Sequence, residues 1–300
     1  MADDLADLLV AGERAAFHGR PVDGVDPLQR AVETARGHGL ESEAAAAGWL
    51  LGVCHATAGR YGTGLDVLDP LVAGHDTPES RVLSALASAT VARVHRQLGR
   101  HSVAQGYDER ALAGSEGQGE AGFDAMLGLA ADAVGLGDAD TAAGRLAEAV
   151  TLTGDRVDWW RQRVRLDWVA AEIALMPGHP DEAAVRAGAA VDLAERSDAP
   201  RHVAKGLLFL GIARLESGQQ PEATAALRRA GLLAERLGTL PLQWPVRALL
   251  GALLAQDDQA ASMACLDSAR RAITVITDDL PEGLRVEWLA RPDVEALLEG

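Results

Sequence analysis

The chain has 300 residues and a formal net charge of −16; 48% of its residues are hydrophobic, although the aromatic residues reach only 4%. Alanine, leucine, glycine and arginine dominate the chain as a whole, which favours helices that pack through small side chains over β-structure. The acidic balance argues against a nucleic-acid-binding surface, which needs a basic face, and Lys205, the only lysine, is followed by Gly206, which excludes a phosphate-binding P-loop.

A spacing pattern recurs from one end of the chain to the other. Each unit has a pair of small or apolar residues, a glycine seven positions after the second of them, and then further small or apolar residues at helical spacing. The marker glycines are Gly19, Gly59, Gly99, Gly137, Gly178 and Gly218, at spacings of 40, 40, 38, 41 and 40 residues. A seventh unit follows, whose turn at 256–258 has no glycine. We therefore expect one repeat domain with units at 3–40, 41–77, 78–117, 118–155, 156–197, 198–238 and 239–277, and a C-terminal cap at 278–300.

The unit around Gly218 shows why the pattern predicts two helices. Before this glycine, Leu207, Leu210 and Gly211 recur at helical intervals, and the period resumes after it with Ala223 and other residues. A glycine between the two segments fits the position after a helix end, where a left-handed backbone is needed. The small residues let the two helices approach closely.

These residues resemble the tetratricopeptide repeat family over roughly residues 3 to 275. The resemblance is carried best by Leu51, Gly52, Gly59, Tyr61, Gly64 and Leu68, and by Leu207, Leu210, Gly211, Gly218, Ala223, Leu227 and Ala230. It implies an all-α, right-handed solenoid of about seven antiparallel helix pairs with a short helical cap. The units average about 40 residues instead of the family's usual 34. In this they resemble the helical sensor regions of actinobacterial regulators.

Catalytic and metal-binding signatures are missing from the sequence. It has no HExxH, GxSxG or strand-borne GxGxxG motif. Its histidines are scattered, and Cys54 and Cys265 are too far apart in the chain to suggest a zinc site. We expect a protein that is not an enzyme and needs no cofactor or metal.

The opening MADDLADLLV lacks a basic segment followed by an apolar one, and no apolar run is long enough to span a membrane. We therefore expect a cytoplasmic protein without a membrane partner.

In the family, the first helices of the units line a concave face that binds a partner. Carried over to this chain, the resemblance places there Phe17, Trp49, Arg93, Arg96, Arg161, Arg165, Trp168, Glu172, Lys205, Leu208, Ile212 and Arg247. The segment DWWRQRVRLDW, 158–168, concentrates the signal, because Arg161, Arg165 and Trp168 share one helix face. An arginine pair beside an aromatic ring can hold a carboxylate or a phosphate.

Two alternatives stay open at this point. Trp49 and Trp168 fit equally well as core residues lodged between adjacent units, and the arginines fit a solvated, salt-bridged start of a helix. Trp244 is a weaker candidate for the face, because Pro245 is expected to begin its helix and leave the ring at the cap.

The sequence thus predicts a non-catalytic protein-interaction scaffold or regulatory adaptor that binds a protein or peptide segment, acidic or amphipathic in character. The alternative is a sensor array that closes around a small peptide or metabolite. Direct nucleic-acid binding is not expected, and self-association is the third possibility.

Overall fold

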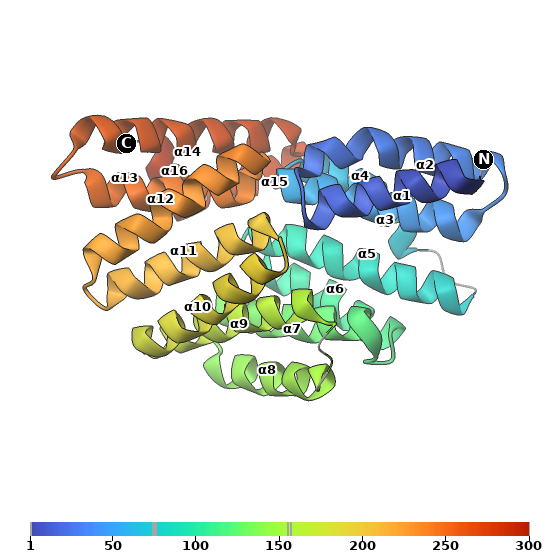
Figure 1. Ribbon diagram of the computed structural model, residues 1–300, viewed down its shortest axis with the longest axis horizontal. Helices are drawn as coiled ribbons and strands as arrows, with labels where there is room; N and C mark the ends of the chain where they lie inside the picture. The colour runs from blue at the N-terminus through green and yellow to red at the C-terminus, as the bar shows by residue number, and fades with distance from the viewer. Residues whose placement is uncertain (1, 74–76, 155, 157, 300) are drawn as a thin grey trace. The chain divides into compact units, whose positions relative to one another are not determined.

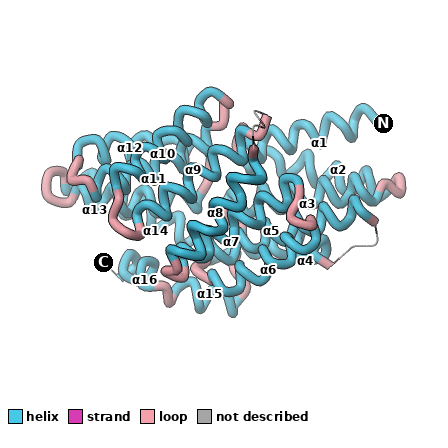
Figure 2. Tube along the Cα trace, turned by 90° about the horizontal axis from the view of Figure 1, so that it is seen from below, coloured by secondary structure: helices cyan, strands magenta, loops and turns pink. Residues whose placement is uncertain are grey.

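The computed structural model describes residues 2–73, 77–154, 156 and 158–299. In these residues the chain forms sixteen α-helices and one 3-10 helix and has no strand (Figure 2). The helices follow one another as packed pairs and end in a short helical cap (Figure 1). The predicted fold class, an all-α array of about seven packed helix pairs with a short C-terminal helical cap, is confirmed. The chain divides into two compact units, residues 1–154 and 155–300.

Unit 1 contains four helix pairs, the first of which is joined by the 3-10 helix η1. Its elements are α1 (Ala2–Phe17), η1 (Pro21–Gly24), α2 (Val25–Gly37), α3 (Glu41–Ala58), α4 (Tyr61–Val72), α5 (Pro78–Gln97), α6 (His101–Gly114), α7 (Gly119–Gly135) and α8 (Ala139–Thr153). The first helices of successive pairs also pack on one another, α1 on α3, α3 on α5 and α5 on α7. They therefore form one continuous layer of this unit.

Unit 2 contains three helix pairs and the cap. Its elements are α9 (Trp160–Leu175), α10 (Pro180–Arg196), α11 (Pro200–Glu216), α12 (Gln220–Leu237), α13 (Leu240–Leu254), α14 (Gln259–Asp279), α15 (Glu282–Leu289) and α16 (Pro292–Glu299). Here α9 packs on α11 and α11 on α13, while both cap helices pack on α14.

The marker glycines end the first helices, as their spacing predicts. Gly218 follows α11 with φ 73°; its N–H donates to the Leu215 carbonyl (3.0 Å), and the N–H of Gln219 donates to the Arg214 carbonyl (2.8 Å). This pair of hydrogen bonds satisfies the last carbonyls of the helix and needs a left-handed residue, which glycine supplies without steric cost. Gly59, Gly99, Gly137 and Gly178 also have positive φ.

Close contact between the two helices of a pair depends on a small residue facing a leucine. A Cβ on Gly211 would lie 2.7 Å from Cγ of Leu227, and a Cβ on Gly12 or Gly52 would overlap Leu28 or Leu68 in the same way. Each of these leucines lies sixteen residues after its glycine and is fully buried. Burial contributes about 1.5–3 kcal/mol for each such side chain, and any larger residue at the glycine would separate the helices.

Two local expectations were wrong. Gly19 does not take the left-handed conformation of the other markers, because the chain passes from α1 directly into η1, which starts with Pro21. Pro245 does not begin its helix either. Helix α13 starts at Leu240, and Pro245 lies inside it, so Trp244 is a half-buried helical residue whose ring meets that of Trp288 edge-on, with centroids 5.9 Å apart.

Replacing Gly52 by alanine should lower the free energy of unfolding by about 1–3 kcal/mol, because the new methyl group overlaps Leu68. The same change at Gly106, in the exposed interior of α6, should raise it by about 0.5–1 kcal/mol, because nothing lies within 4 Å and alanine favours the helix. Urea unfolding of both variants measures the difference. Equal effects at the two sites would contradict the packing described here.

Candidate functional site

In unit 1, side chains of α5 tie the layer of first helices together. The Trp49 indole on α3 donates to Oγ1 of Thr90 (3.1 Å). Arg93 donates in the other direction, from α5 to Oγ1 of Thr57 (3.2 Å) and to the Val53 carbonyl (3.5 Å). The predicted face residues Trp49 and Arg93 therefore both use part of their hydrogen-bonding capacity to hold α3 against α5.

One turn further along α5, Arg96 lies in a cluster of charged groups. Its Nε donates to Oδ1 of Asp132 on α7 (2.7 Å), its Nη2 donates to the other oxygen of that carboxylate (3.1 Å), and Nη2 also donates to Asp108 on α6. Nδ1 of His101 lies 3.5 Å from Oδ1 of Asp132. Both carboxylate side chains are 1% exposed and that of Arg96 only 15%, so this arginine offers a partner little surface.

In unit 2, α9 and α11 hold a cluster of aromatic rings under a cation. The Trp168 ring stacks on that of His202 with centroids 5.3 Å apart, and the Trp160 ring meets His202 edge-on at 5.1 Å. Nζ of Lys205 lies 4.9 Å from the Trp168 centroid and 5.4 Å from that of Phe209. Cations at such distances from aromatic rings are attracted to the ring faces.

Trp168 is only 4% exposed. The sequence left open whether Trp168 lies on the concave face or in the core between adjacent helix pairs. Its burial fits the core position, because the His202 ring of the following pair covers its ring. Its Nε1 has no hydrogen-bond partner among the described residues and lies beside Gly206. Trp168 therefore supports Lys205 from below and has almost no surface of its own to offer.

The remaining predicted face residues are distributed over both units. Phe17 packs half-buried against the core of unit 1. Leu208 is buried, at 8% exposure. Arg247 on α13 pairs with Glu235 (Nη2 to Oε2, 2.6 Å) and lies 3.7 Å from the Cys265 sulfur. Half-buried positions on α9 and α11 belong to Arg161, Arg165, Glu172 and Ile212.

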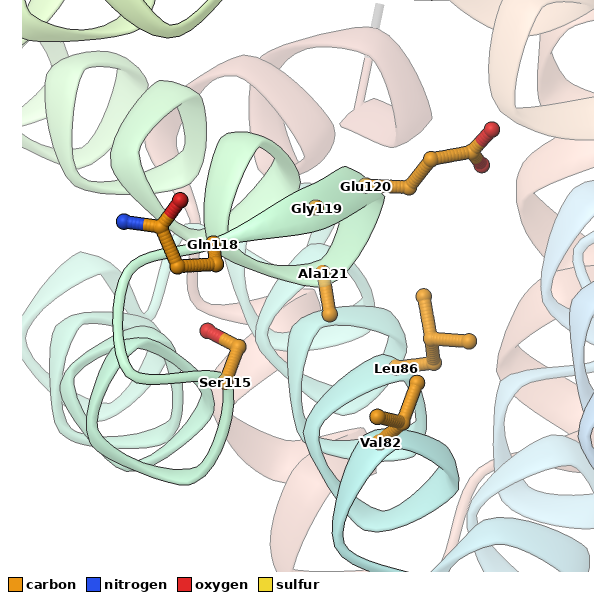
Figure 3. Close-up of a pocket in the computed structure, with 7 residues that line it drawn as sticks. All are labelled: Val82, Leu86, Ser115, Gln118, Gly119, Glu120 and Ala121. Carbon is orange, nitrogen blue, oxygen red and sulfur yellow. The ribbon is translucent and has the colours of Figure 1, made fainter. Parts of the chain in front are cut away.

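A shallow pocket of about 440 Å³ lies in unit 1 between the start of α5 and the turn that leads into α7 (Figure 3). Its walls are mostly apolar: Val82 and Leu86 project from α5 towards Ala121, while the side chains of Gln118 and Glu120 point outwards (Figure 3). The pocket contains none of the predicted face residues.

The sequence missed several residues of these clusters. His202 and Phe209 were not predicted, although they lie three residues before and four residues after the predicted Lys205 on one helix face, a spacing that indicates a stripe of aromatic and cationic side chains. Asp108 stands where the other units have leucine or alanine, which also marks it as an exception.

Neither a metal site nor a membrane span is found in the described part of the chain. No three histidine, cysteine or carboxylate side chains there come together as ligands of an ion. None of the described helices is both long and apolar enough to cross a bilayer.

No family model matches the sequence, and no curated protein matches it significantly. Solved structures do match its fold. A Rap protein complexed with competence and sporulation factor superimposes with a TM-score of 0.67 at 10% identity, over 100% of this chain and 89% of that one. One chain of the APC/C hetero-tetramer Cut9-Hcn1 superimposes with a TM-score of 0.62 at 15% identity, over 97% of this chain and 54% of that one. Aspartyl phosphate phosphatase F from Bacillus subtilis gives 0.50 at 14% identity over 99% and 81%. At such identities the likeness shows the helical-repeat fold alone.

His95, the neighbour of Arg96 on α5, should make stability depend on pH. Burial, and then the charge of Arg100, lower the pKa of His95 to about 4. The unfolded chain takes up a proton near pH 6.5, whereas His95 in the folded protein stays neutral down to about pH 4. This histidine therefore costs no stability well above pH 6.5 and lowers the free energy of unfolding progressively as the pH falls from 6.5 towards 4.

Urea unfolding of the wild type and of His95→Gln at pH 7, 5.5 and 4.5 isolates this contribution. The wild type should lose more stability than the variant over this range. Parallel losses in the two proteins would show that the imidazole is protonated in the folded state as readily as in the unfolded chain.

Proposed function

We propose that this protein is a non-catalytic scaffold or regulatory adaptor that binds an acidic or amphipathic segment of a partner protein. The observation that carries the proposal is the α9–α11 face, where Lys205 lies over the rings of Trp168 and Phe209. The rings are buried, and the lysine is half-buried. A cation fixed in this way loses little side-chain entropy when it binds a carboxylate.

Charge supports an acidic partner for this face. The protein as a whole carries a formal charge of −16, yet α9 and α11 place Arg161, Arg165 and Lys205 at half-buried positions. Each guanidinium has five N–H donors and the ammonium has three, so a group that already has one partner can still donate to a second. Ile212, half-buried on the same helix as Lys205, offers an apolar contact for the neighbouring residue of the segment.

The proposal extends to properties that the resemblance implied. A structure of similar fold is that of a Rap protein complexed with competence and sporulation factor, which supports a role in binding a partner for this chain. We also propose a cytoplasmic protein with no catalytic role, similar to the helical sensor regions of actinobacterial regulators. If no partner segment binds, we propose that the protein associates with further copies of itself.

A sensor function is the second candidate, and the unit 1 pocket favours it. A volume of about 440 Å³ falls within the range that accommodates small molecules. Such a ligand should raise the melting temperature of the protein in an extract freed of macromolecules, and the rise should disappear when Leu86→Arg fills the pocket. A rise that Leu86→Arg leaves unchanged would contradict a ligand in this pocket.

Fluorescent 12-residue peptide pools test the main proposal. A pool of aspartate, glutamate and leucine should bind the protein, more weakly as salt rises because charge is screened, whereas a pool with lysine in place of the acidic residues should not bind. Lys205→Glu and Arg165→Glu should each reduce binding at least tenfold. Arg145→Glu is the matched control, since Arg145 pairs with Glu148 on α8 and is not one of the residues of this face, and it should bind as the wild type does. Equal binding by all four proteins would refute the site.

A further inference from the structure

The junction between the third and fourth helix pairs differs chemically from the other pairs of unit 1 and unit 2. Arg96 lies three residues before its marker glycine, a position filled elsewhere by Ala16, Ala56, Val134, Leu175 and Leu215. Asp108 lies nine residues after that glycine, a position filled elsewhere by Leu28, Leu68, Leu146, Ala187 and Leu227. A guanidinium and a carboxylate have thus replaced two apolar side chains in one pair.

The fourth pair carries matching changes. Asp132 lies five residues before its marker glycine. Five of the other helix pairs have an apolar residue or cysteine at this position, and the first pair has an exposed arginine there. At the positions of Gly128 and Gly135, every other helix pair has a larger side chain. A Cβ on Gly128 would overlap the Asp108 carboxylate, and one on Gly135 would overlap the His101 ring. The five departures therefore meet at one place, and the glycines leave the room that the charged groups occupy.

The geometry joins three helices through one arginine. Arg96 of α5 donates to both oxygens of Asp132 on α7 and also to Asp108 on α6. Among the described residues, the charged and titratable groups that meet at the junction include Arg96 on α5, Asp108 and His101 on α6, and Asp132 on α7. His95, next to Arg96 on α5, stacks on the Tyr107 ring with centroids 5.5 Å apart.

Such a cluster adds little to stability and much to selectivity. Buried ion pairs gain about as much from attraction as they lose on leaving water, so apolar residues of similar size serve stability equally well. A buried charge without its partner is strongly unfavourable, however. The leucine and alanine junctions of a repeat array tolerate exchange of one pair for another, and wrong pairings are a known failure of such arrays. A charged junction excludes every pairing that leaves Asp108 or Asp132 without Arg96.

We propose that Arg96, Asp108 and Asp132 form a pairing lock: they select the α7–α8 pair as the neighbour of the α5–α6 pair and fix the register in which the two dock. The lock is independent of the proposed peptide site, which lies on α9 and α11.

The triple variant Arg96→Leu/Asp108→Leu/Asp132→Val tests the lock, because it places at the junction the apolar residue types that other helix pairs have at the same positions. Its urea midpoint should equal or exceed that of the wild type. Hydrogen exchange followed by mass spectrometry should show peptides of α7 exchanging at least tenfold faster than in the wild type, while peptides of α3 are unchanged. Arg81→Leu, at an exposed arginine of the same helix α5, is the control and should leave both readouts unchanged.

Arg96→Leu alone is the second variant, since it leaves two buried carboxylates without their counter-ion. It should lower the urea midpoint well below that of the triple variant. Two outcomes would overturn the proposal. If the triple variant retains wild-type protection in α7, the charges do not select the pairing. If its midpoint falls to that of Arg96→Leu, the cluster is an ordinary stabilising contact.

Discussion

Contact between a small residue on the first helix and a leucine about sixteen residues later sets the geometry of most helix pairs. Where Gly52 meets Leu68 or Gly211 meets Leu227, no atom can be added without separating the helices. The separation within a pair decides where its second helix meets the next first helix, so this contact also sets the position of the following pair. The packing of successive first helices within each compact unit follows from this constraint.

The constraint divides the side chains into two groups with different roles. Those that define the repeat, such as Gly211 and Leu227, are buried between the two helices of a pair. Those between them on the first helices are left to vary, and they include Lys205 and Arg165 in unit 2. At some of these variable positions the side chain makes hydrogen bonds to a neighbouring helix. Arg93 and Arg96 hold α5 to its neighbours on either side, which is why these two arginines contribute less to a binding face than their positions suggest.

Much of the architecture could be predicted from the sequence, because its determinants are local. A glycine at a helix end and a 3.6-residue apolar period depend on neighbours within a few residues, and they placed the helix pairs. The state of the face residues depends on the next pair along the chain. Trp168 is buried because His202, more than thirty residues away, stacks on its ring, and no local pattern contains that contact. Gly19 failed as a marker for the opposite reason, since Pro21 directs the backbone into a 3-10 helix before the turn can form.

If the α9–α11 face binds a partner, the partner must cover Lys205, and this can be measured directly because Lys205 is the only lysine in the sequence. Limited acetylation by an amine-reactive ester, followed by mass spectrometry, compares Lys205 with the α-amino group of the same chain. The pool of acidic, leucine-containing peptides should slow acetylation of Lys205 several-fold and leave the α-amino group unaffected. Peptide binding with an unchanged rate at Lys205 would contradict binding at this face.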